Sequence, residues 1–179
     1  PSMHLGGFAG FQHDPRLTAG ECLLPRAAAI DPNSQSLLVT CFGIDSVIAY
    51  DAMSSTPARA TRKHWNVGAG PTGIAVDPET HQAFVFSQFD RSISVLKLDA
   101  MDELVDDKGN PPAVTKTALA PLRDGNVSPQ FIVGRMLFHA SGDIRISNDG
   151  RACASCHPDG RDDAITWATP EGPRRSIML

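Results

Sequence analysis

The chain has 179 residues and a formal net charge of −4, with 16 basic and 20 acidic side chains. This length allows one or two domains with a real core, and charges of both signs are interspersed, which argues against a dedicated nucleic-acid surface. No apolar run approaches the roughly 18 residues that a membrane-spanning helix needs. The 15 Gly and 14 Pro favour short elements joined by turns, and so β structure over long helices.

The first 20 residues are glycine-rich, and we expect them to be irregular. They contain His4 and His13, which we interpret as loop histidines, with metal ligation as the alternative. The chain opens on Pro1-Ser2-Met3-His4 and has no charged and then apolar leader. We therefore interpret it as a mature chain or a fragment.

An internal repeat decides the architecture of the first half. The stretch 25–32 matches the stretch 71–78, and the Asp-Pro steps that begin at Asp31 and Asp77 are 46 positions apart. A repeat of this length is typical of a propeller blade of four short strands. For the second unit we predict strands at 72–77, 82–88 and 92–98. A fourth, outer strand is expected at 59–67 in the first unit and at 113–118 in the second. Ala83–Phe86 is apolar on consecutive residues, which predicts burial on both faces of that strand.

The repeat resembles the YVTN-type β-propeller repeat, whose blades carry the pattern GPxGIAVxP…VYVxN…VSVID. The matching residues are 67–78, 84–88 and 92–96, and the first copy departs from the pattern at Ala27 and Phe42. The resemblance implies an all-β, incomplete propeller. Because two blades cannot close a ring, we expect further blades to precede residue 1, to come from another chain, or to have been lost to proteolysis.

Two of the four cysteines fall in this first half. Cys22 precedes the first predicted strand and Cys41 ends the second, positions that an antiparallel pair brings within disulfide range. A leftover pair in a secreted chain favours a disulfide, and two buried free thiols are the alternative.

We divide the chain into two blades at 1–120, a linker at 121–129 and a haem segment at 130–179. The acidic stretch at 99–107 is interpreted as a solvated loop rather than a calcium loop, because it lacks the EF-hand order. A short helix followed by a loop is expected at 130–149. The end of the chain, from Trp167 onward, reads as a loop.

A CxxCH motif at residues 153–157 carries the chemistry. Cys153 and Cys156 have the spacing that forms two thioether bonds to a haem, and His157 then supplies the proximal nitrogen to the iron. A redox-active CxxC needs a strand-then-helix context that is absent here, and a zinc site needs a second ligand pair. The motif therefore predicts covalent haem c.

The flanking residues strengthen this interpretation. Gly134, Leu137-Phe138, Arg145-Ile146-Ser147, the CxxCH and Gly172-Pro173-Arg174 occur in the order GxxLFxDxRLSxxGxxxCxxCH…GPRN. This set resembles the first haem domain of dihaem cytochrome c peroxidases and the related methylamine-dehydrogenase-maturing enzymes. The resemblance implies a small, mainly α or irregular cytochrome c-like segment. It also implies that Arg174 pairs with a haem propionate, with a surface arginine as the alternative.

The far side of the iron is an open question at this stage. The family carries a distal histidine soon after CxxCH, but no histidine follows His157, and Trp167 stands near that position, beside the haem. The iron is then either five-coordinate and open to peroxide, or closed by Met178 or His139. The nearby carboxylates Asp162, Asp163 and Glu171 are weighed as acid–base groups and interpreted as surface side chains.

The resemblance implies an exported haem enzyme that reduces peroxide, or oxidises a substrate at its haem, with electrons from a small cytochrome or cupredoxin. The alternatives are an electron-transfer cytochrome whose propeller docks a partner, and a binding propeller with a haem appendage. Since haem c is attached after export, we expect the periplasm or the cell surface. The rest of the propeller and a second haem domain are expected from the same protein or another chain.

Overall fold

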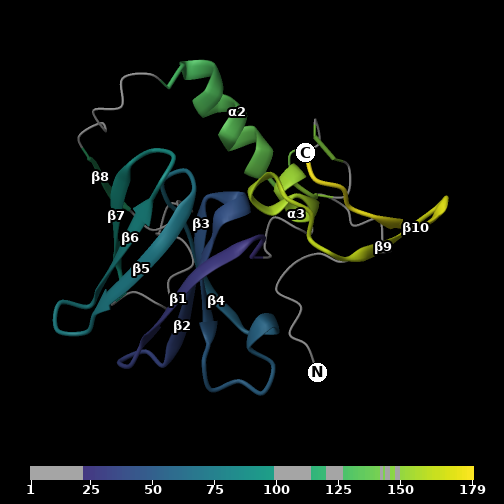
Figure 1. Ribbon diagram of the computed structural model, residues 1–179. Helices are drawn as coiled ribbons and strands as arrows, with labels where there is room; N and C mark the ends of the chain where they lie inside the picture. The colour runs from purple at the N-terminus through teal and green to yellow at the C-terminus, as the bar shows by residue number, and fades with distance from the viewer. Residues whose placement is uncertain (1–21, 99–113, 120–126, 142, 144–145, 148–149) are drawn as a thin grey trace.

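The computed structural model describes residues 22–98, 114–119, 127–141, 143, 146–147 and 150–179 (Figure 1). Two four-stranded antiparallel sheets, here called blade 1 and blade 2, hold most of the regular structure. Blade 1 contains β1 Pro25–Asp31, β2 Ser36–Cys41, β3 Ser46–Asp51 and β4 Thr61–Asn66. Blade 2 contains β5 Pro71–Asp77, β6 Gln82–Ser87, β7 Ser92–Lys97 and β8 Thr115–Ala118. The strands follow one another in chain order, which confirms the predicted propeller-type blades.

The two Asp-Pro steps fold as the sequence predicts. Asp31 ends β1 and accepts the Ser34 hydroxyl at 2.5 Å, and Asp77 ends β5 and accepts the Thr80 hydroxyl at 2.7 Å. An aspartate carboxylate that accepts hydrogen bonds from residues two and three positions further on favours a turn, so the strand ends at the aspartate. The hydrogen bond from Thr80 and the next one from Glu79 lower the pKa of Asp77.

The main core lies between the blades. It is formed by one face of each sheet, with β5 packed beside β1. Its buried members are Leu38, Val47, Ala49 and Trp65 from blade 1 and Ala83, Val85, Leu96 and Leu98 from blade 2. The other face of blade 1 forms a second buried cluster of Cys22, Val39, Cys41, Ile48 and Tyr50.

The prediction that β6 is buried on both faces is wrong. Ala83 and Val85 are fully buried, but Phe84 between them is 38% exposed and Phe86 is half-buried. Successive side chains of a strand point to opposite faces, and blade 1 covers only one face of blade 2.

The remaining described residues form a helical segment and a hairpin at one end of the blades (Figure 1). They comprise α2 Pro129–His139, α3 Cys153–Cys156, the 3-10 turn η3 Pro158–Gly160, β9 Thr166–Thr169 and β10 Gly172–Arg175. Two more 3-10 turns lie in blade 1, η1 Phe42–Ile44 and η2 Pro57–Arg59. The Ser128 hydroxyl caps α2 by accepting the Phe131 N–H at 3.2 Å.

The prediction of a loop at the end of the chain is also wrong. β9 and β10 pair antiparallel, with Gly172 opposite Thr169. The Thr169 hydroxyl donates to the Gly172 carbonyl at 2.7 Å, and Gly172 adopts a φ of 108° that glycine tolerates best. Pro170 and Glu171 therefore form a tight turn between two short strands.

Several expectations fall outside the described residues, namely those for His4, His13, the acidic stretch 99–107 and Arg145. Of the helices in the part of the chain that the structure describes, none is long and apolar enough to cross a membrane.

Candidate functional site

The CxxCH motif folds into a single helical turn, α3. Cys153 and Cys156 lie three positions apart, which places both sulfur atoms on the same side of the turn. The turn is closed by the Ser155 N–H, which donates to the Ala152 carbonyl at 3.0 Å, and by the Ala152 N–H, which donates to the Ser155 hydroxyl at 3.1 Å. Neither thiol is in a disulfide, and Cys153 is exposed whereas Cys156 is half-buried. The turn therefore presents two reduced thiols together.

His157 leaves the helix directly after the second thiol, with φ −123° and ψ 63°. Its Nδ1 atom is buried and has no hydrogen-bond partner among the described residues. A buried ring nitrogen without a partner is costly, so the surroundings of this imidazole are incomplete. A histidine that ligates a metal through one ring nitrogen usually donates the other to an oxygen acceptor.

The segment that contains α3 exposes several large apolar side chains. In the described part of 127–179, Ala152 and Ala154 are the hydrophobic residues that are fully buried. The large exposed side chains are Val127, Phe131, Ile132, Val133, Leu137, Ile165, Ile177, Met178 and Leu179. Two thiols, an imidazole and uncovered apolar side chains on the same segment fit a covalently bound haem, whose ring needs apolar contacts.

The zinc alternative gains nothing from the structure. Within the described ranges, no group of three or more His, Cys, Asp or Glu side chains is arranged to hold a metal ion. A structural zinc site needs four such ligands.

The hairpin brings Trp167 and Arg174 together. They are directly opposite each other on β9 and β10, so their side chains share a face. The guanidinium of Arg151 lies 5.3 Å from the centre of the Trp167 ring. Sequence reasoning missed Arg151, although its position two residues before Cys153 was a signal.

Of the three carboxylates considered as acid–base groups, Asp163 is already engaged. Its Oδ2 accepts the Trp167 indole N–H at 2.6 Å. Burial alone would raise the pKa of Asp163, but hydrogen bonds from the Ile165 N–H, Trp167 and Ser176 outweigh it and lower the pKa. Asp162 is half-buried, and Glu171 is exposed in the hairpin turn. Asp163 therefore positions Trp167.

The two candidates for the distal side of the iron are placed differently. His139 ends α2 with its ring against Phe42, Phe89 and Phe138, and its Nδ1–H donates to the Arg135 carbonyl at 2.8 Å. Its ring thus packs against the blades. Met178 is 67% exposed, and the neighbouring Leu179 N–H donates to the Gly160 carbonyl at 3.2 Å, which holds the tail beside η3.

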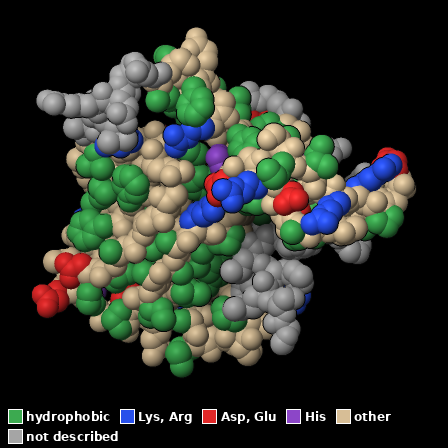
Figure 2. Space-filling model, in the orientation of Figure 1, with side chains coloured by type: hydrophobic (Ala, Val, Ile, Leu, Met, Phe, Trp, Pro, Cys, Tyr) green, Lys and Arg blue, Asp and Glu red, His purple; other side chains and the backbone are tan. Residues whose placement is uncertain are grey.

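A cavity of about 220 Å³ lies where α2 meets the blades. Its lining residues are Phe42, Gly43, Asp45, Phe89, Met136, Leu137, His139, Ala140 and Asp143. Figure 2 shows basic side chains gathered at this junction, where Arg26 stacks on Phe42 and Arg135 stacks on Phe89, each at 4.9 Å. Burial raises the pKa of Asp45. Sequence reasoning missed this junction. The pattern that could have indicated it is an aromatic residue shortly after each second strand, Phe42 after β2 and Phe89 after β6.

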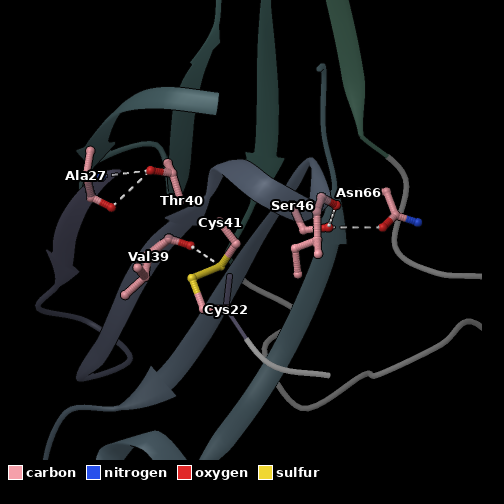
Figure 3. Close-up of a disulfide and its surroundings, with 8 residues drawn as sticks. Cys22, Ala27, Val39, Thr40, Cys41, Ser46 and Asn66 are labelled. Atoms are coloured by element: carbon pink, nitrogen blue, oxygen red, sulfur yellow. Dashed lines mark hydrogen bonds between the residues drawn. A yellow bond between two sulfur atoms is a disulfide. The ribbon is translucent and has the colours of Figure 1, made fainter. Parts of the chain in front are cut away.

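The Cys22–Cys41 disulfide, the pair that the sequence favours, forms in the structure (Figure 3) and lies directly before η1 in the chain. The bond fixes the segment before β1 to the end of β2. The Phe42 N–H then donates to the Leu24 carbonyl at 3.2 Å and the Gly43 N–H to the Leu23 carbonyl at 3.0 Å. The disulfide thereby holds η1, on which α2 rests.

A family model supports the assignment of the blades to a β-propeller. The family model described as "Lactonase, 7-bladed beta-propeller" matches residues 25–166. A crystal structure of a protein from Lactobacillus plantarum is similar at 18% identity and a TM-score of 0.39, over 87% of this chain and 41% of that chain. The chain therefore spans about two fifths of that structure's length. No curated protein matches the chain.

Proposed function

This chain belongs to the lactonase family of seven-bladed β-propellers, and we propose that it carries a c-type haem on a segment docked against its blades. The observation that carries the proposal is α3, which presents Cys153 and Cys156 on one side of a single turn and is followed by His157. Family membership gives the fold of the blades and does not by itself give an activity.

Attachment needs thiols that are reduced and reachable. Each thiol adds across one vinyl group, so an S–H bond and a C=C π bond are replaced by an S–C and a C–H bond without net oxidation. Cys153 is exposed and Cys156 is half-buried, and neither is in a disulfide. Both therefore meet the requirement.

Around an attached haem, each residue has a distinct role. His157 holds the iron on the proximal side, and Arg174 binds a propionate because its planar guanidinium matches a carboxylate. Trp167 forms a wall of the site, fixed by its bond to Asp163 and by the stacked Arg151. A bound haem supplies an iron that takes up and releases single electrons.

For the activity we propose a cytochrome c peroxidase-like oxidoreductase that reduces peroxide, or oxidises a substrate at its haem. Among the residues that the structure describes, His139 packs against Phe42 and Phe89 of the blades, so this histidine would not close the distal side of a bound haem. An open side is what a peroxide needs. The electrons come from a small cytochrome or cupredoxin.

One observation favours a second candidate, an electron-transfer cytochrome with a propeller that docks a partner. The backbone bond from Leu179 to Gly160 holds Met178 beside the loop that follows His157. A methionine thioether on the iron raises the potential and closes the distal side, which suits a relay.

Both candidates place the protein outside the cytoplasm, in the periplasm or at the cell surface. Haem c is attached after export, and a disulfide such as Cys22–Cys41 persists in an oxidising compartment. We propose that the rest of the propeller and a second haem domain come from the same protein or from another chain.

Attachment is tested by expressing the protein in a periplasm that contains the haem c maturation apparatus. We expect a protein mass increased by one haem that survives denaturation, and loss of this increase in Cys153→Ala/Cys156→Ala. The exposed-residue variant Met53→Ala is the control. A wild-type protein that remains free of covalent haem, while folded, overturns the proposal.

The two activities are separated by the state of the distal side. An open site predicts that carbon monoxide binds the reduced protein and that Met178→Ala changes neither the spectrum nor peroxide turnover. A relay predicts a low-spin spectrum with a methionine–iron charge-transfer band that disappears in Met178→Ala. Peroxide-dependent oxidation of a reduced cytochrome supports the enzyme directly.

A further inference from the structure

The helical turn that carries the two thiols, α3, lacks the usual means of starting a helix. It is four residues long, far shorter than a helix that is stable alone in water, because nucleation is costly. Its N-cap position is held by Ala152, whose side chain offers no oxygen to the first backbone N–H groups. The conformation of α3 must therefore be set by other contacts.

Ser155 makes the contact that Ala152 cannot make. Its hydroxyl accepts the Ala152 N–H at 3.1 Å, and its own N–H donates to the Ala152 carbonyl at 3.0 Å. A side chain at the third helical position that reaches back to the N-cap N–H is one half of a capping box. Because Cys153 lies between the two bonded residues, Ser155 fixes the backbone that carries the first thiol.

Backbone hydrogen bonds continue this order past the second thiol. The His157 N–H donates to the Cys153 carbonyl at 3.0 Å, and the Gly160 N–H donates to the His157 carbonyl at 3.0 Å. The backbone is therefore hydrogen-bonded on both sides of Cys156.

The inner side of the turn is anchored to the rest of the segment. Ala152 and Ala154 are each 4% exposed, whereas Cys153 between them is exposed. The turn packs beside α2 (Figure 1). Just before the turn, the guanidinium of Arg151 lies 5.3 Å from the centre of the Trp167 ring. The turn is thus held from its inner side, with Cys153 on its exposed side.

None of these contacts uses a sulfur atom or the imidazole ring of His157. The hydrogen bonds join backbone atoms and the Ser155 hydroxyl, and the buried side chains are alanines. The imidazole, by contrast, has a buried Nδ1 atom without a partner among the described residues. The backbone of the turn is therefore complete without a haem, and the surroundings of His157 are what a haem would complete.

We propose that Ser155 is a positioning residue that forms the attachment turn before the haem arrives, so that haem is added to a folded segment. The inference rests on the proposed function. At each thiol the S–H bond adds across one vinyl C=C bond, so the step needs no oxidant. Two thiols already held on one side of a turn meet both vinyl groups of one haem without further loss of chain entropy, which favours two thioether bonds over one.

The first test is amide hydrogen exchange of the intact protein, produced in a periplasm that lacks the haem c maturation apparatus. We expect the Ser155 and His157 amides to exchange at least about tenfold more slowly than in an unfolded chain, since both are hydrogen-bonded. Ser155→Ala should lower this protection about fivefold, the usual effect of losing a helix cap. Ser155→Thr, which keeps a hydroxyl, should restore it. Unprotected amides in the haem-free wild type would overturn the proposal, because the turn would then form only after attachment.

The second test counts thioether bonds by peptide mass mapping after co-expression with that apparatus. Ser155→Ala should lower the ratio of doubly to singly attached haem at least about threefold, and Ser155→Thr should recover it. Ser128→Ala removes a hydroxyl cap of the same kind from α2 and is the matched control. Equal ratios in Ser155→Ala and Ser128→Ala would overturn the proposal.

Failure of this inference is distinguishable from failure of the proposed function. A folded wild-type protein without covalent haem refutes the proposed function and this inference with it. Unprotected Ser155 and His157 amides in a chain that does take up haem refute the inference alone.

Discussion

The ring of His139 meets the ring of Phe42 edge to face, with the ring centres 4.9 Å apart. His139 ends α2 and Phe42 begins η1, so this contact joins the C-terminal segment to blade 1. Phe89 of blade 2 lies 5.2 Å from Phe42 and 5.4 Å from His139. Three elements that are distant in sequence therefore meet in one aromatic cluster.

Removing the central ring should destabilise the junction. Phe42 is 3% exposed, and truncation of a buried phenylalanine costs about 3–5 kcal/mol in the free energy of unfolding. We expect this loss in Phe42→Ala by urea denaturation, together with faster proteolysis between α2 and α3. Phe131→Ala, at a ring that is 55% exposed, should change stability by less than about 0.5 kcal/mol. Equal effects of the two variants would show that the cluster does not hold the segment.

Gly43 lets the C-terminal segment that begins with α2 approach blade 1. Its carbonyl accepts the Ser141 N–H at 2.7 Å, and a Cβ added to Gly43 would lie 2.9 Å from the Ser141 Cβ. Gly43→Ala should therefore lower the free energy of unfolding by about 1–3 kcal/mol. Ser141→Gly removes the clashing side chain, so the double variant should recover part of the loss. A double variant no more stable than Gly43→Ala would contradict this contact.

The Cys22–Cys41 bond should account for a large part of the stability of blade 1. The two cysteines are separated by 19 positions, and closing a loop of this length stabilises a fold by roughly 3 kcal/mol. Cys22→Ser/Cys41→Ser should lose this amount, measured by denaturation of the haem-free protein. Cys153→Ser is the matched control, because the Cys153 thiol is exposed and is not part of a disulfide. A wild-type protein that is reduced while unfolded in denaturant and then refolds with unchanged stability would argue against the bond.

His64 should make the protein less stable in mild acid. Burial lowers its pKa below the ordinary 6.5, and its buried Nε2 has no partner among the described residues. The unfolded state then binds the proton more tightly, so the contribution to stability is present above about pH 6.5 and is lost as the pH falls below it. His64→Gln should flatten the fall in stability between pH 7 and about pH 5. His81→Gln, at an exposed histidine, is the control.

Much of the fold could be predicted because the repeat fixes it locally. The Asp31 and Asp77 turns, the alternating strands and the 46-residue spacing each specify a blade without reference to distant residues. The exposure of Phe84 could not be predicted in the same way, since it depends on whether a neighbour covers that face of blade 2. The final hairpin was missed because Trp167 and Arg174 pair through a turn of Pro170 and Glu171, without the Asn-Gly or Asp-Gly signal of a tight hairpin.

The residues of the candidate site fall into two groups, those placed by local spacing and those placed by tertiary contacts. Cys153, Cys156 and His157 are defined by spacing within one turn, which the sequence shows directly. The positions of Trp167 and His139 depend on tertiary contacts with Asp163 and with Phe42, which no local pattern contains. The arrangement of the motif within one turn could be predicted, whereas its tertiary surroundings needed the fold.

The burial of the disulfide has a consequence for maturation. Under the proposed function the chain must hold one cysteine pair oxidised and the other reduced in the same compartment. Thiol–disulfide exchange requires a thiolate to reach a sulfur of the bond. Cys22 and Cys41 are 1% and 0% exposed, so the exposed Cys153 thiol cannot attack them once blade 1 has folded. Folding of blade 1 thus protects the chain from scrambled pairings during the interval before both CxxCH thiols are consumed.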